Sequence, residues 1–214
     1  MSHKPKILIA VFTGPERCYW INPSLAMQLL QASHSFKFDV SVECVFGKRP
    51  VDFARNYAVA QARDKFSDWL LMLDNDQSFT RDPLEILAAA GDKQIIGLPS
   101  IMISLSEKQG KPVLIPNMAG ALGVDGRFLE VTHIGTGGLF VHRAIWETIP
   151  GPWFRTVPCD DELLTLKTSE DWFFCDRVRE HGFKVWIHGD HGLLHYHTLE
   201  LAALAVERNG AAKA

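Results

Sequence analysis

Two carboxylates stand two residues apart in the segment Asp74-Asn75-Asp76, directly after a short apolar run. Carboxylate oxygens at this spacing suit one hard divalent cation, because such cations prefer oxygen ligands. Asp and Asn are also common turn-forming residues after any strand, so a plain turn explains the segment as well. In an open α/β sheet, however, ligands bind beyond the carboxyl ends of the strands. The segment is therefore a candidate ligand or metal site if a strand precedes it.

A histidine-rich segment near the C-terminus is a second candidate site. Four of the nine histidines lie within ten residues there, beside Asp190. They are His188, His191, His195 and His197. Imidazole next to a carboxylate suits Mn²⁺, Zn²⁺ or Fe²⁺. Any single histidine is more often a surface or hydrogen-bonded core residue, but we expect at least one of the four to contact a metal or an anionic ligand.

An acidic pair, Glu170-Asp171, begins a predicted helix after Thr168-Ser169. Acidic side chains in a first helical turn are stabilised by the helix dipole, and Ser169 or Thr168 can cap the helix. That structural role is enough to explain two acidic residues at the start of a helix. The functional alternative is that one carboxylate is the general base of a group transfer, within hydrogen-bond reach of an acceptor hydroxyl.

Arg55 and a glycine-rich loop complete the set of candidate residues. An arginine at position 55 either lies on the solvated side of its helix or neutralises the charge of a bound phosphate. The loop Gly135-Thr136-Gly137-Gly138 has neither the spacing of a dinucleotide fingerprint nor the lysine of a P-loop. It is either a tight turn or a place where the backbone approaches a ligand closely.

Alternating strands and helices must position these residues. Apolar runs predict strands at 6–12, 38–45, 69–73, 94–98, 139–142 and 183–188. Helical spacing and start signals predict helices beginning at Pro23 and near Pro83, and at 51–62, 144–148, 169–180 and 199–208. This alternation indicates right-handed crossovers and a mainly parallel sheet. We expect a hairpin or loop insertion at 110–134, and a proline-rich loop at 150–158.

Composition bounds the class of protein. A chain of 214 residues is the usual size of one domain, and its net charge of −3 argues against nonspecific nucleic-acid binding. We expect no transmembrane segment and no secretory signal, because the apolar runs are too short. The cysteines at 18, 44, 159 and 175 form no C-x-x-C pair, which favours free thiols and a cytoplasmic location.

Four of these segments, in this order, resemble the GT-A glycosyltransferases, in particular small bacterial and phage-type enzymes similar to family 2. The segments are Ile7 to Thr13, Phe53 to Asn56 with Trp69 to Asp76, Gly135 to Arg143, and Ser169 to Arg177 through His195. The resemblance implies a single-domain, Rossmann-like GT-A fold with helices on both faces of the sheet. It places the catalytic domain at 1–198 and a C-terminal helix and tail at 199–214.

The resemblance also implies a donor site. Asp74 and Asp76 match an Asp-x-Asp motif, in which Asp76 ligates the metal and Asp74 contacts the ribose or a metal-bound water. Thr13, at the end of the first strand, and Arg55 match positions near the donor nucleotide. The family's metal-binding histidine matches His195, but the local pattern departs from Gly-His-x-Gly, so His197 or His191 is an alternative ligand.

The acceptor side follows from the same resemblance. Gly137 and Gly138 match the loop that approaches the sugar, and Asp171 matches the catalytic base of inverting members, with Glu170 beside it. We therefore expect a glycosyltransferase that uses Mn²⁺ or Mg²⁺ to move a sugar from a nucleotide-diphosphate sugar to a saccharide or another hydroxyl acceptor. The alternatives are a metallohydrolase built on the segment His188 to His197, and a nucleotide-sugar-binding module without turnover.

Overall fold

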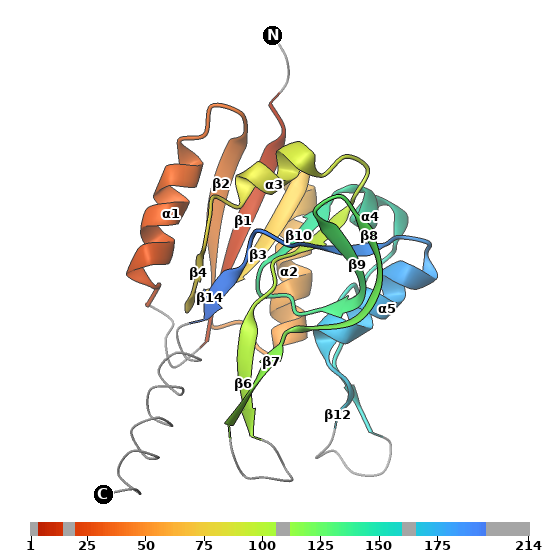
Figure 1. Ribbon diagram of the computed structural model, residues 1–214. Coiled ribbons are helices and arrows are strands. Elements are labelled where there is room, and N and C mark those ends of the chain that lie inside the picture. Colours follow the sequence, from red (N-terminus) through yellow and green to blue (C-terminus); the bar gives the residue numbers. More distant parts are fainter. Residues whose placement is uncertain (1–3, 15–19, 106–111, 160–165, 196–214) are drawn as a thin grey trace, which may run out of the picture.

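A mixed central sheet of eight strands forms the core of the computed structural model (Figure 1). The structure describes residues 4–14, 20–105, 112–159 and 166–195. The sheet has the order β2-β1-β3-β10-β5-β13-β9-β8. These strands are β2 (Asp39–Phe46), β1 (Lys6–Thr13), β3 (Trp69–Asp74), β10 (Leu139–His142), β5 (Ile95–Gly97), β13 (Val185–His188), β9 (Phe128–Ile134) and β8 (Met118–Asp125).

The direction of the strands confirms a mainly parallel sheet. β10 and β9 run antiparallel to both of their neighbours, and the other six strands run in one direction. β1 lies between β2 and β3 and is buried from Ile7 to Thr13. Its continuous apolar sequence is the pattern of a strand that is covered on both faces.

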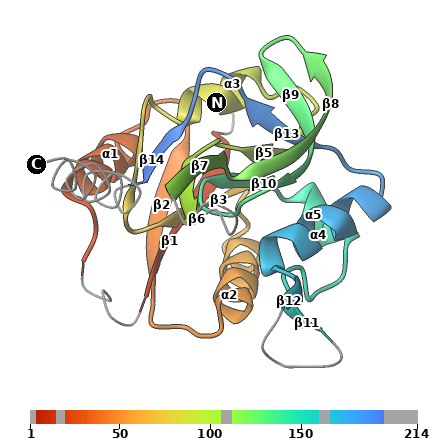
Figure 2. The ribbon, with the colours of Figure 1, turned by 60° about the horizontal axis from the view of Figure 1, so that its bottom comes forward.

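Helices cover both faces of the sheet, as predicted (Figure 2). On one face, α1 (Pro23–Ser33) and α3 (Leu84–Ala89) pack with Ile7, Ile9 and Val11 of β1. On the other face, α2 (Val51–Asp64), α4 (Ala144–Thr148) and α5 (Glu170–Glu180) pack with the alternate residues Leu8 and Ala10. The period of two along β1 therefore divides one strand between two apolar layers.

The predicted helix boundaries follow from local signals that the structure confirms. Asn22 Oδ1 accepts from the backbone N–H groups of Ser24 (2.8 Å) and Leu25 (3.3 Å), which caps α1. Gly182 follows α5 with a φ of +83°, a conformation that favours glycine at the end of a helix. No helix in the described part of the chain is long and apolar enough to cross a membrane.

The expected insertion at 110–134 is wrong in part, because β8 and β9 extend the central sheet. β8 pairs with β9 through a turn at Gly126, and its register shifts between Ala121 and Gly123. β8 is an edge strand with mostly exposed residues, so its sequence carries no alternation that marks a strand. β6 (Ile101–Leu105) and β7 (Pro112–Pro116) form a separate hairpin, of which β7 lies in the predicted region.

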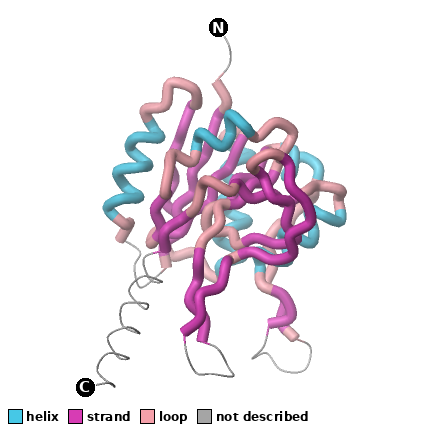
Figure 3. Tube along the Cα trace, viewed as in Figure 1, coloured by secondary structure: helices cyan, strands magenta, loops and turns pink. Residues whose placement is uncertain are grey.

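Short strands that the sequence does not predict lie at the end of the molecule where β1 and β3 finish. β4 (Gln77–Phe79) pairs with β14 (Leu193–His195), and β11 (Val157–Pro158) pairs with β12 (Leu166–Thr168). The β6–β7 and β11–β12 hairpins project from this same end (Figure 3). The predicted helix at 199–208, with the rest of the tail 199–214, lies outside the described residues.

Candidate active site

A cavity of about 360 Å³ lies at the carboxyl ends of β1 and β3. Pockets of this size commonly hold small-molecule ligands. Its lining brings together five predicted site residues, namely Thr13, Arg55, Asp74, Asp76 and His195. The remaining lining residues are Phe12, Gly14, Val45, Lys48, Arg49, Pro50, Val51, Ala54 and Asn75. The site thus lies where open α/β sheets bind their ligands.

Arg55 is a buried cation in the wall of this cavity. Its side chain is only 4% exposed, and its Nη2 donates to Asp74 Oδ1 at 2.8 Å. The guanidinium lies 4.0 Å from the centre of the Phe12 ring. Arg55 Nε and Nη1, together with Thr13 Oγ1, are buried and make no hydrogen bond within the described residues. A buried arginine with unused donors is the exception among arginines and fits a site for an anion.

Asp74 is held in place from two sides. Its backbone N–H donates to Gln77 Oε1 at 3.0 Å, and Gln77 Nε2 donates to Asp74 Oδ2 at 3.5 Å. A Cβ atom on Gly137 would come within 2.4 Å of Asp74 Oδ2 and of Gln77 Nε2. A larger residue at 137 would therefore displace the carboxylate that pairs with Arg55. The structure gives Gly137 this packing role beside the cavity.

Gly138 has a different role from its neighbour. Its φ is +93°, and a Cβ atom there would come within 2.2 Å of Leu193 Cδ1. Its backbone N–H donates to the Met72 carbonyl at 2.7 Å, and its own carbonyl accepts from the Leu98 N–H at 2.7 Å. The glycine therefore allows the chain between β9 and β10 to pack closely under β14.

Asp76 and His195 meet across the β4–β14 pair. In this pair His195 lies opposite Gln77, and His195 Nε2 lies 3.1 Å from Asp76 Oδ1. The hydrogen bond to Asp76 raises the pKa of His195, whereas burial acts in the opposite direction. The Asp76 carboxylate is a ligand that suits Mn²⁺ or Mg²⁺, and the His195 imidazole adds a nitrogen donor that suits a transition metal such as Mn²⁺ better.

The described residues contain no group of three or more His, Cys, Asp or Glu side chains that could hold a metal ion. A cation at Asp76 and His195 would therefore need oxygen atoms from water or from a bound ligand to complete its coordination. This arrangement is usual for Mg²⁺, which is often held by one or two carboxylates together with substrate phosphates. The two residues fit a metal that arrives with an anionic ligand.

Among the described histidines of the C-terminal segment, His188 and His191 do not line this cavity. His188 Nδ1 and His191 Nδ1 lie 3.0 Å apart, and His191 Nε2 lies 3.8 Å from Glu85 Oε2. Asp190 instead pairs with Arg127 at 2.8 Å. Within residues 188–195, only His195 contacts Asp76, so the described residues do not form the zinc centre that a metallohydrolase would need. His197 lies outside the described residues.

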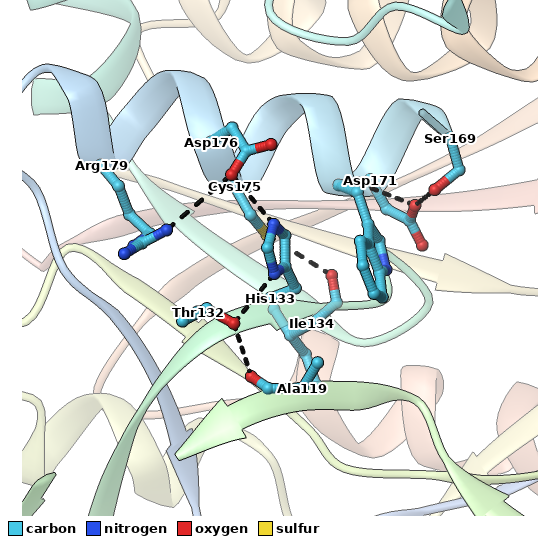
Figure 4. A network of polar contacts seen from close by, with 10 residues as sticks. Ala119, Thr132, His133, Ile134, Ser169, Asp171, Cys175, Asp176 and Arg179 are labelled. Carbon is cyan, nitrogen blue, oxygen red and sulfur yellow. Dashed lines mark hydrogen bonds and ion pairs between the residues drawn. The ribbon is translucent and has the colours of Figure 1, made fainter. Parts of the chain in front are cut away.

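Glu170 and Asp171 occupy the first turn of α5, as predicted. Figure 4 shows Asp171 beside Ser169 at the start of this helix. Asp171 Oδ1 accepts from Ser169 Oγ and from the Trp172 backbone N–H. Burial, followed by the neighbouring Asp171 carboxylate, raises the pKa of Glu170, and the Arg55 guanidinium opposes this shift. Glu170 and Asp171 are not among the residues that line the cavity, although the charges of Arg55 and Asp74 contribute to the pKa of Glu170.

The three cysteines of the described residues do not line the cavity. Cys44, Cys159 and Cys175 are free thiols, and Cys18 lies outside the described residues. Burial raises the pKa of Cys175 to about 12, and its thiol contacts the Ile134 carbonyl (Figure 4). A thiol with such a pKa stays protonated and is a poor nucleophile.

Three contributors to the cavity are absent from the sequence-based prediction. Lys48 and Arg49 add two cations to its wall, and Gln77 fixes Asp74. Lys48 and Arg49 lie in the turn between β2 and α2, where neither strand nor helix periodicity distinguishes a site residue from a solvated one. One feature of the sequence could have identified them: they follow the strand after the first crossover, at the carboxyl end of the sheet, where ligands bind.

Comparison of the sequence with protein-family models and with curated proteins gives no match. Comparison of the structure gives similar folds. "A197 from STIV" has a TM-score of 0.58 and 14% identity, covering 89% of this chain and 85% of that one. An apo-UDP-glucose pyrophosphorylase has a TM-score of 0.52 and 8% identity, covering 99% and 100%.

A third structure, a glycosyltransferase involved in the glycosylation of the major capsid of PBCV-1, has 16% identity and covers 70% of this chain and 69% of that one. Its TM-score of 0.38 is too low to carry an argument. At the identities of the first two structures, the likeness shows a shared fold and no more. The chain therefore has a Rossmann-like α/β fold of the kind found in "A197 from STIV" and in a UDP-glucose pyrophosphorylase.

Proposed function

We propose that this protein is a metal-dependent glycosyltransferase of the GT-A type, which takes its sugar from a nucleotide-diphosphate sugar. The observation that carries the proposal is the composition of the cavity. Its wall holds the ion pair between the buried Arg55 and the partly exposed Asp74, and the Asp76–His195 pair lines the same space. A site with both cations and metal-ligating groups suits a diphosphate and its divalent metal together.

Different residues of the cavity would bind the diphosphate, the metal and the nucleoside. Lys48, Arg49 and Arg55 supply positive charge for the diphosphate. Asp76 and His195 would hold the metal, Mn²⁺ or Mg²⁺, and the lining residues Thr13 and Asp74 would contact the nucleoside. When bound, the metal neutralises the negative charge that develops on the leaving diphosphate.

Asp171 takes the role of general base in this proposal. The acceptor oxygen forms a bond to the anomeric carbon of the donor sugar, and the bond from that carbon to the diphosphate oxygen breaks. The electron pair leaves with the nucleoside diphosphate, and the acceptor hydroxyl proton moves to the Asp171 carboxylate. Glu170, whose pKa depends in part on the charges of Arg55 and Asp74, would adjust the charge near the bound donor. This displacement inverts the anomeric configuration.

A donor panel tests the proposal. UDP-, GDP-, dTDP- and CDP-sugars are incubated with the protein and Mn²⁺, with and without a mixture of saccharide acceptors, and the products are identified by NMR. We expect one donor to release its nucleoside diphosphate and to transfer its sugar. Formation of a nucleotide sugar from a nucleoside triphosphate and a sugar 1-phosphate, the activity that the name pyrophosphorylase implies, would replace the proposal with nucleotidyl transfer. Donor binding without any turnover would instead indicate a binding module.

A further inference from the structure

Trp172 is a large aromatic side chain that remains 45% exposed directly after the proposed base, Asp171. Its ring stacks on His133 of β9, with centroids 4.3 Å apart and an interplanar angle of 17°. Because His133 covers one face of the indole, the exposed area belongs to its edge and its opposite face. Isolated exposed aromatics are common, but this one is held flat by another ring.

The imidazole that supports Trp172 is itself fixed on both sides (Figure 4). His133 Nδ1 lies 2.9 Å from Thr132 Oγ1, and His133 Nε2 lies 2.9 Å from Asp176 Oδ1. Thr132 Oγ1 in turn donates to the Ala119 carbonyl at 2.9 Å, which connects the network to β8. Trp172 and Asp176 are four residues apart on α5, so one face of the helix contacts the same imidazole twice.

Helix geometry places Glu170 and Trp172 on nearly opposite sides of α5, with Asp171 between them. Successive residues of an α-helix point about 100° apart. Glu170 is partly buried, whereas Trp172 is exposed and stacks on His133 of β9. Asp171 therefore lies beside the exposed aromatic side of the helix. In a displacement, the acceptor must reach the base from the side opposite the leaving diphosphate.

We propose that the open face of Trp172 is the stacking platform for a saccharide acceptor. The C–H groups on one face of a pyranose ring carry partial positive charge and match the negative face of an indole. An aromatic ring that is already fixed by its neighbours binds such a ring with little loss of side-chain entropy. The inference rests on the proposed function, and it names the acceptor as a sugar ring that presents an apolar face.

Acceptor kinetics with Trp172→Ala and Trp172→Phe test the platform. We expect Trp172→Ala to raise the KM for the saccharide acceptor about tenfold, with little change in kcat at saturating acceptor. Trp172→Phe keeps a ring and should stay within about threefold of the wild type. Hydrolysis of the donor in the absence of acceptor, and affinity for the nucleoside diphosphate, should not change. Phe36→Ala, which removes an exposed aromatic from the loop between α1 and β2, is the matched control.

Two results would overturn the platform. One is an unchanged acceptor KM in Trp172→Ala, and the other is an equal fall of transfer and donor hydrolysis, which would indicate general damage to the site. Saturation-transfer NMR with the same saccharides gives a readout that needs no turnover. A saccharide signal that disappears in Trp172→Ala supports the platform, and one that persists refutes it. Nucleotide binding without saccharide binding would reject the platform alone, whereas absence of nucleotide binding would reject the proposed function.

Discussion

Replacing Arg55 with methionine removes a buried positive charge from the wall of the cavity while keeping an unbranched, apolar side chain of similar length. The substitution deletes the charge-assisted hydrogen bond to Asp74 (2.8 Å), which is of a kind that contributes about 1.5–3 kcal/mol. It also deletes the contact of the guanidinium with the Phe12 ring (4.0 Å), of a kind that contributes about 0.5–2 kcal/mol. Asp74 is 34% exposed and is partly rehydrated, so we expect a net loss of about 2–3 kcal/mol.

Thermal unfolding and ligand titration measure the two consequences of Arg55→Met. For a chain of this length, each kcal/mol shifts Tm by about 2–4 °C, so Tm should fall by roughly 4–12 °C. Loss of one charge-assisted contact to the diphosphate should weaken nucleoside-diphosphate binding about 10–100-fold. Arg55→Lys restores the charge without the planar group and should bind with intermediate affinity.

The control is Arg63→Met on the same helix. Arg63 is 59% exposed and only approaches Asp64, at 3.9 Å, so its loss should change stability by less than about 0.5 kcal/mol and leave binding unaltered. Arg55 has no special role in the cavity if Arg55→Met unfolds and binds like Arg63→Met. A loss of stability with unchanged binding would mean that Arg55 is a structural partner of Asp74 and not part of a ligand site.

Three further substitutions test separate parts of the account. Asp171→Asn should lower sugar transfer about 10²–10⁴-fold with donor binding retained, and the base lies elsewhere if transfer persists. The folded state raises the pKa of Glu170 above its ordinary value of 4.5, so the free energy of unfolding should fall as pH rises through the folded-state pKa. Glu170→Gln should therefore unfold at a higher temperature than the wild type at pH 7 but not at pH 4. Parallel pH profiles of the two proteins would refute the shift. Gly138→Ala, which places a Cβ atom 2.2 Å from Leu193 at a φ of +93°, should lose about 2–4 kcal/mol of stability in chemical denaturation, whereas Gly123→Ala, with no atom within 4 Å, should lose less than about 1 kcal/mol.

Local signals in the sequence predict much of the sheet and its helices. The apolar run of β1, the Asn22-Pro23 start of α1 and the strand that ends at Asp74 are visible because each is encoded within a few neighbouring residues. The position of Asp74 and Asp76 at the carboxyl end of a buried strand follows from the same local pattern.

Contacts between distant segments could not be predicted in the same way. β4 and β14 have three residues each and are more than 110 positions apart, so no periodicity reveals the pairing that brings His195 to Asp76. The burial of Arg55 could not be predicted either, because the sequence of α2 does not show whether this arginine is solvated. Its burial depends on the contacts with Phe12 and Asp74, which come from other segments. The exposed edge strand β8 lacks the apolar alternation from which strands are predicted.

Calorimetric titration of nucleoside diphosphates, with and without Mn²⁺, into the wild type and Asp76→Asn tests the central claim most directly. Asp76 lines the cavity and contacts His195. We therefore expect the wild type to bind one nucleoside diphosphate only when Mn²⁺ is present, and we expect Asp76→Asn to lose this Mn²⁺-dependent binding. At about 100 times its dissociation constant the ligand should also stabilise the wild-type fold by roughly 2.7 kcal/mol. Equal, Mn²⁺-dependent binding by the wild type and by a correctly folded Asp76→Asn protein would contradict the account.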